Sequence, residues 1–107
     1  MRRKNKPRWQ AFEEAVENLL LYYKCSFHKV TNYRCFVCGQ VQNAKAKNFP
    51  DFFIYHPRVF AVECKTGKGE LSKGQEKVKE QMEEAGIKYI LLRDTTDDLI
   101  NFLTEGN

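Results

Sequence analysis

Apolar side chains recur every three or four residues between Trp9 and Lys24, which predicts an amphipathic helix over that span. The apolar stripe of this helix consists of Phe12, Val16, Leu19, Leu20 and Tyr23. Two short runs follow, 26–30 and 33–37, in which β-branched and aromatic residues predict strands. Turn-forming residues at 31–32 and at Gly39 separate these runs from their neighbours.

Two further strands are predicted in the middle of the chain, at 51–55 and 59–65. A turn at His56-Pro57 separates them. If the two strands pair as a hairpin around this turn, the start of the first strand lies beside the end of the second. Asp51 would then lie next to Glu63.

The last third of the chain alternates between helix and strand patterns. Ser72 and Gln75 form a capping box that begins a helix, and Gly86 ends it. A strand over 87–92 and a short helix, capped by Thr95 or Thr96 and running through Leu103, complete the chain. The crossover from 65 to 87 places a helix between two parallel strands, so we expect an α/β fold with a mixed central sheet.

The length of 107 residues and the 42% hydrophobic content fit a single domain over 9–107, preceded by a basic flexible tail over 1–8. No apolar run approaches the roughly 20 residues that span a bilayer, so no membrane partner is expected. No apolar stretch with a cleavage site follows the basic start, so we expect no secretory signal and a cytoplasmic location.

The net charge of +4 is distributed unevenly, because residues 1–8 hold five basic groups and no acid lies between Glu17 and Asp51. Such asymmetry favours a polyanionic partner, and DNA phosphates are the partner that we expect. The predicted DNA-binding residues are Arg2, Arg3, Lys4, Lys6, Arg8, Lys29, Arg34, Lys45 and Lys47. The alternative is a solubilising tail followed by a solvated hairpin.

Polar side chains stand at the end of the predicted strand 59–65, where Glu63 and Lys65 share one face by alternation. With Asp51 beside them, two carboxylates would repel unless a cation lay between them, and their hard oxygens suit Mg²⁺ or Mn²⁺. A neighbouring lysine can orient an attacking water or stabilise charge on a phosphate. The alternative is a surface ion pair between Glu63 and Lys65, with an aspartate that only begins a strand.

Three motifs carry a resemblance to a known family: Asn48-Phe49-Pro50-Asp51, Val62-Glu63-Cys64-Lys65 and Leu71-Ser72-Lys73-Gly74-Gln75. Together they resemble the PD-(D/E)XK nuclease superfamily. Within it the chain is most similar to the virus-type replication-repair nuclease (VRR-NUC) domain, and next to the Holliday-junction resolvases. The resemblance covers about residues 10–103. Asn48 departs from the family pattern, which has a glycine at this position.

The resemblance implies a restriction-endonuclease-like αβββαβ(α) core with a mixed central sheet flanked by helices. It also implies a metal-dependent phosphodiesterase whose metal ligands are Asp51, Glu63 and the backbone carbonyl of Cys64. Lys65 would orient the nucleophilic water, and Gln75 would support the site from the next helix. These families also place a glutamate on the first helix.

Glu13 fits that last role best, because at 100° per residue it lies about 20° from Leu20, at the edge of the apolar stripe. We expect it to be a catalytic residue and a further candidate metal ligand. The alternative is one more exposed helix acid. Trp9, Met82 and Tyr89 are expected to be packing residues.

The cysteines offer a second metal hypothesis. Cys35 and Cys38 form a CxxC pair, and Cys25 and His28 lie upstream, so the four residues could mimic a zinc site. A second CxxC pair is missing, and Cys25 and His28 would face opposite sides of an extended strand. Free thiols are therefore favoured over zinc.

These patterns lead to two hypotheses from different classes. The first is a Mg²⁺- or Mn²⁺-dependent DNA endonuclease that acts on branched or otherwise structured DNA in replication, recombination or repair. We expect a homodimer, since symmetric cutting of two strands requires two active sites. The second is a non-catalytic nucleic-acid-binding module, stabilised by zinc at Cys35 and Cys38.

Overall fold

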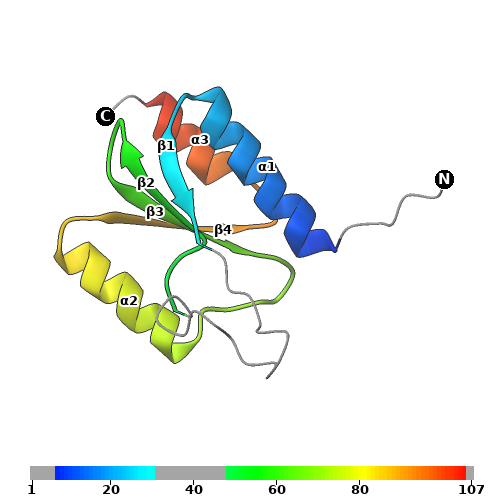
Figure 1. The fold of residues 1–107 in the computed structure, drawn as a ribbon. Helices are drawn as coiled ribbons and strands as arrows, with labels where there is room; N and C mark the ends of the chain where they lie inside the picture. The colour runs from blue at the N-terminus through cyan, green and yellow to red at the C-terminus, as the bar shows by residue number, and fades with distance from the viewer. Residues whose placement is uncertain (1–6, 31–47, 106–107) are drawn as a thin grey trace, which may run out of the picture.

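The computed structural model describes residues 7–30 and 48–105 (Figure 1). Along the chain its elements are α1 (Arg8–Tyr22), β1 (Ser26–Lys29), β2 (Phe52–His56), β3 (Phe60–Lys65), α2 (Lys73–Glu84), β4 (Lys88–Arg93) and α3 (Asp97–Thr104). The predicted α/β class is confirmed for this part of the chain. The strand predicted over 33–37 lies outside the described residues.

The described strands form one mixed sheet in the order β1-β2-β3-β4. The pairs β1–β2 and β2–β3 are antiparallel, and β3 pairs with β4 in parallel. Both the predicted hairpin and the predicted parallel crossover are thereby confirmed. Phe52 pairs with Val62, so the preceding residue, Asp51, lies opposite Glu63. A slip of one residue would have placed the two carboxylates on opposite faces.

Helices cover both faces of the sheet: α1 and α3 lie on one side, and α2 lies on the other (Figure 1). Alternation along β3 divides the core accordingly. Phe60 and Val62 pack with the α1 and α3 side chains. Ala61 packs with Met82 of α2 and with Tyr89 of β4. Glu63 and Lys65 follow Ala61 in the alternation, so they extend the α2 face of β3 at its carboxyl end.

The boundaries of α2 follow from the residues that the sequence places there. Ser72 Oγ accepts a hydrogen bond from the Gln75 backbone at 3.2 Å, and Gln75 Oε1 accepts one from the Ser72 backbone at 2.9 Å. The predicted capping box is therefore confirmed. Gly86 has a φ of 84°, a left-handed conformation that favours glycine, and it ends the helical stretch as predicted.

The first and last helices differ slightly from the prediction. Helix α1 ends at Tyr22, because Lys24 adopts a left-handed φ of 59° and turns the chain into β1. Thr96 occupies the N-cap position of α3 without a side-chain cap, and Thr95 Oγ1 accepts a hydrogen bond from the Asp97 backbone instead.

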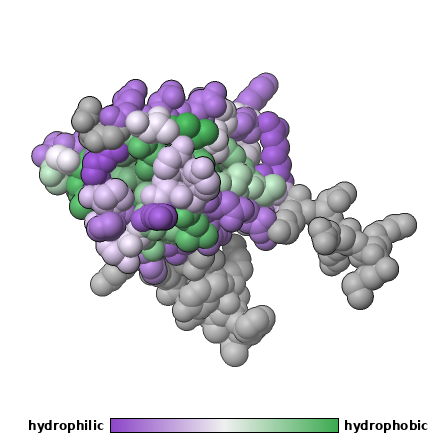
Figure 2. Space-filling model, turned by 90° about the horizontal axis from the view of Figure 1, so that it is seen from above, coloured by the Kyte–Doolittle hydropathy of each residue, from purple (hydrophilic) through white to green (hydrophobic). Residues whose placement is uncertain are grey.

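The surface seen from above in Figure 2 mixes hydrophilic residues with separate apolar patches. Within 7–30 and 48–105, no helix combines the length and apolar character required to cross a membrane.

Candidate active site

The carboxyl end of β3 brings the two predicted carboxylates together. The backbone N–H of Asp51 donates to Glu63 Oε1 at 3.2 Å. The backbone N–H of Cys64 donates to Asp51 Oδ2 at 2.8 Å. Each carboxylate therefore accepts a hydrogen bond from the backbone of the other half of the hairpin. The register of the hairpin brings the two acids together.

Helix α2 adds Gln75 to this pair and connects it with Lys65. Lys65 Nζ donates to Gln75 Oε1 at 3.1 Å and lies 3.5 Å from Glu63 Oε2. Gln75 Nε2 donates to the same Glu63 oxygen at 3.3 Å. Because the capping box also holds Gln75 Oε1, the first turn of α2 sets the positions of both the lysine and the glutamate.

Burial dominates the electrostatics of this cluster. Glu63 is only 3% exposed, and its burial raises its pKa from 4.5 to about 7. The nearby charge of Asp51 acts in the same direction, and Lys65 opposes it. Burial also raises the pKa of Asp51, against the hydrogen bond from Cys64 and the charge of Lys65. Negative charge is thus poorly compensated here, which favours binding of a cation.

Helix α1 directs Glu13 toward the same end of the sheet. Burial raises the pKa of Glu13, and the charge of Asp51 is the next largest cause. Lys29 of β1 opposes this shift, with its Nζ atom 3.9 Å from Glu13 Oε1 and 3.4 Å from Glu17 Oε1. Glu13 therefore interacts electrostatically with the site, from the sheet face opposite α2.

The donor set suits a hard divalent cation. The oxygens of Asp51 and Glu63 are ligands that Mg²⁺ and Mn²⁺ accept, and Mg²⁺ typically binds one or two carboxylates and keeps several waters. In the described part of the chain, no three His, Cys, Asp or Glu side chains gather closely enough to hold a metal ion. A cation held by Asp51 and Glu63 would therefore take most of its remaining ligands from water.

Two of the predicted DNA-binding residues make ion pairs within the protein. Arg8 lies 2.9 Å from Asp94, which follows β4, and Lys29 pairs with Glu17 and Glu13. The other seven, and both candidate zinc ligands, lie outside the described residues: Arg2, Arg3, Lys4, Lys6, Arg34, Lys45, Lys47, Cys35 and Cys38.

The structure adds residues that the sequence did not single out. Arg93 Nη1 donates to the Gly67 and Gly69 carbonyls, and Asp94 Oδ2 accepts from the Gly67 N–H at 2.9 Å. These contacts fix the loop that directly follows Lys65. Only the parallel pairing of Lys65 with Arg93 brings them together, so no local sequence signal could have revealed them.

Two further residues connect the motifs in space. The Asn48 side chain lies against Gly74, where a Cβ atom would collide with it, so the segment before Asp51 packs on the first turn of α2. Tyr89 is buried on the α2 face, where it pairs with Ala61, and within the described residues its hydroxyl is the one buried side-chain polar atom with no hydrogen-bond partner. Burial raises the pKa of Tyr89, and the charge of Glu63 adds to the shift.

Comparison with protein-family models, with curated proteins and with solved structures finds no match to this chain. What the site does must therefore be inferred from its own geometry and chemistry.

Proposed function

We propose that this protein is a divalent-metal-dependent DNA endonuclease of the PD-(D/E)XK superfamily, similar to VRR-NUC domains and selective for branched or otherwise structured DNA. One observation carries the proposal: a buried glutamate, Glu63, held against Asp51 by a backbone hydrogen bond, with Lys65 and Gln75 on its other oxygen. Within 7–30 and 48–105 the elements follow the order αβββαβα, which agrees with the αβββαβ(α) core that the resemblance implies.

A purely structural ion pair accounts for less of this arrangement. If Glu63 were the only acid, the charge of Lys65 could neutralise it. Asp51 adds a second carboxylate to the cluster and raises the pKa of Glu63 further. Glu63 is buried and Asp51 is half-buried, and placing two acids together in this way costs free energy that Lys65 and Lys29 offset only in part. Perturbed acids of this kind concentrate at functional sites.

Each residue of the site would have a separate role in hydrolysis. Mg²⁺ or Mn²⁺, held by Asp51, Glu63 and the Cys64 carbonyl, would polarise the phosphate and lower the pKa of a bound water. Lys65 would orient the attacking water and stabilise charge that develops on the phosphate. Gln75 would keep Lys65 and Glu63 in register, because its amide contacts both.

A homodimer belongs to the same proposal, because a four-way junction or a duplex is cut symmetrically only by two sites. The alternative, a non-catalytic nucleic-acid-binding module, predicts DNA binding without turnover.

The test uses the full chain with supercoiled plasmid, a four-way junction and flap DNA, in Mg²⁺, in Mn²⁺ and in EDTA. We expect cleavage that requires the metal and that is lost in Asp51→Ala. Glu80→Ala, which removes an exposed acid from α2, is the matched control and should cut normally. Normal turnover by Asp51→Ala would contradict the proposed site, and tight binding without cleavage of any substrate would favour the alternative.

A further inference from the structure

Trp9, the one tryptophan of the chain, has an exposed ring at the end of the molecule that holds the carboxylates. Its side chain is 54% exposed, although its position in the sequence predicted a packing role. It is the second residue of α1, and the first residue, Arg8, pairs with Asp94 at 2.9 Å. Because Asp94 follows the end of β4, this ion pair holds the first turn of α1 at the site end of the sheet.

Helix geometry relates Trp9 to the proposed site. Glu13 follows Trp9 by four residues, so the two side chains lie on one face of α1, separated by a rise of about 6 Å. Glu13 is the helix residue whose pKa the charge of Asp51 affects. Trp9 therefore lies one helical turn farther out from the carboxylates, on the side of the helix that faces them.

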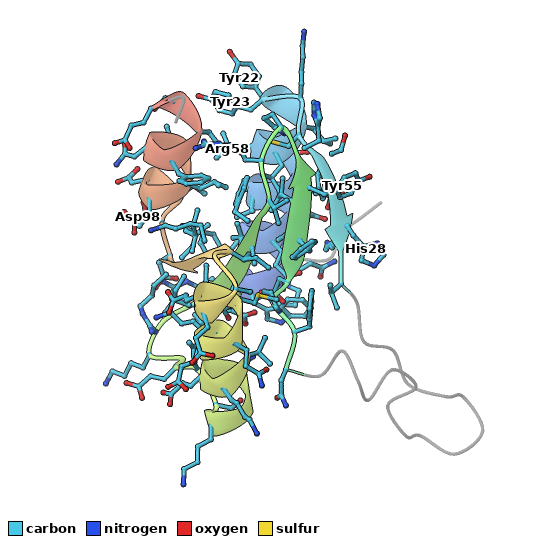
Figure 3. The ribbon with its side chains drawn as sticks, turned by 90° about the vertical axis from the view of Figure 1, so that its left-hand side faces the viewer. Tyr22, Tyr23, His28, Tyr55, Arg58 and Asp98 are labelled. Atoms are coloured by element: carbon cyan, nitrogen blue, oxygen red, sulfur yellow. The ribbon has the colours of Figure 1, made fainter. Side chains whose placement is uncertain are left out.

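A second exposed aromatic residue on the same helix provides a comparison. Tyr22 ends α1, is 77% exposed and contacts Tyr23 edge-on, with ring centroids 5.1 Å apart (Figure 3). Trp9 makes no ring contact within the described residues. Tyr22 follows Trp9 by thirteen positions, a rise of about 20 Å, so of these two residues only Trp9 is near the site.

We infer that Trp9 stacks on an unpaired base of the DNA strand, next to the phosphate at which the proposed nuclease acts. An aromatic ring can stack on any base, but in a duplex the base faces are already covered by neighbouring bases. Trp9 and Glu13 are separated by an axial rise of only about 6 Å, so the stacked base would lie at the site end of α1. The substrate class is therefore duplex DNA with a single-stranded extension or branch, unpaired within a few nucleotides of the cut. This inference rests on the proposed function for the position of the cut.

The experiment measures DNA binding in EDTA, so that cleavage plays no part. The ligands are a long blunt duplex and the same duplex with a 5′ or a 3′ single-stranded extension. Because the chain has one tryptophan, quenching of its fluorescence reports on Trp9 alone. Fluorescence anisotropy of labelled DNA gives the affinities of the wild type, Trp9→Ala, Trp9→Phe and the matched control Tyr22→Ala.

We expect extended DNA to quench Trp9 fluorescence more strongly than the blunt duplex does. Trp9→Ala should weaken binding of at least one extended DNA by about fivefold to a hundredfold, and binding of the blunt duplex much less. Trp9→Phe should retain part of the affinity, and Tyr22→Ala should bind normally. If Trp9→Ala melts at a lower temperature, wild-type quenching and Trp9→Phe still decide the question.

The inference would be overturned if the blunt duplex and the extended DNA quenched Trp9 fluorescence equally. It would also be overturned if Trp9→Ala lost the same affinity for both. Its failure is distinct from failure of the proposed function. Mg²⁺-dependent cleavage with no effect at Trp9 would overturn the stacking role alone. Selective stacking with no cleavage would uphold that role and contradict the nuclease.

Discussion

The buried carboxyl of Glu63 should make the metal-free protein less stable as the pH rises, and Glu63→Gln should remove this dependence. In the folded protein burial raises the pKa of Glu63 from 4.5 to about 7. The folded state thus binds this proton more tightly than the unfolded state does. Below about pH 4.5 both states are protonated and the contribution of Glu63 to stability is fully present.

The size of the effect follows from the same shift. Between about pH 4.5 and about pH 7 only the unfolded state releases the proton, so stability falls by about 1.4 kcal/mol for each pH unit. Above about pH 7 both states are ionised and the full loss, about 3 kcal/mol, has been incurred. At 3% exposure, solvent screens this carboxyl little.

The glutamine variant keeps the shape of the side chain and removes its charge. Its carbonyl oxygen can still accept the Asp51 N–H, but its amide NH₂ would face the donors of Gln75 and Lys65. This mismatch offsets part of the gain. We therefore expect the variant to be more stable than the wild type by about 1–3 kcal/mol at about pH 8, and by less at about pH 5.

The assay is urea denaturation of both proteins in EDTA at several pH values, with the difference in unfolding free energy plotted against pH. Taking the difference removes most of the titration of groups that the two proteins share, such as Asp51 and Glu13. A difference that does not change with pH, or a variant that is less stable at about pH 8, would refute the reasoning. Adding Mg²⁺ at about pH 8 should stabilise the wild type and not the variant.

Three further predictions test other parts of the site. Lys65→Ala should lower the single-turnover cleavage rate by about 10²–10³-fold while DNA binding in EDTA persists, and an unchanged rate would assign Lys65 a structural role. Deletion of residues 1–6, which leaves Pro7 as the N-cap of α1, should reduce the slope of log K against log salt by up to about 0.9 for each of four basic residues. Identical slopes would show that the tail does not contact phosphate. Tyr89→Phe should leave the unfolding free energy unchanged or raise it by up to about 1 kcal/mol, because the hydroxyl lost is buried without a partner; a clear loss in urea denaturation would contradict this.

The features that sequence predicted well are those that depend on local periodicity and capping. The period of two along 59–65, together with a short turn, was enough to place Asp51 beside Glu63. The Ser72 capping box was enough to begin α2 at the right residue and to bring Gln75 to its first turn. In both cases the side-chain direction follows from a few neighbouring residues.

Other contacts between residues of different elements could not be predicted from the sequence, because they depend on how the elements pack in three dimensions. At 100° per residue Trp9 lies about 20° from Leu20, so the periodicity places it on the apolar stripe. Its ring is nevertheless exposed, because periodicity gives the direction of a side chain and does not say whether a partner lies opposite. Likewise, Lys29 meets Glu13 and Glu17 only because β1 lies beside α1.

The two least favourable groups of the core, the Glu63 carboxyl and the Tyr89 hydroxyl, lie on the same face of the sheet. Glu63 is the one buried charged residue in the described part of the chain, and Tyr89 carries the buried hydroxyl without a partner. Both face α2, whose first turn supplies Gln75. A fold selected only for stability would place apolar side chains at these positions, as β3 does at Phe60 and Val62. Local departures from good packing are expected where a protein maintains a functional site, so the contacts of buried Glu63 with Asp51 and Lys65 favour the proposed catalytic role over a structural ion pair.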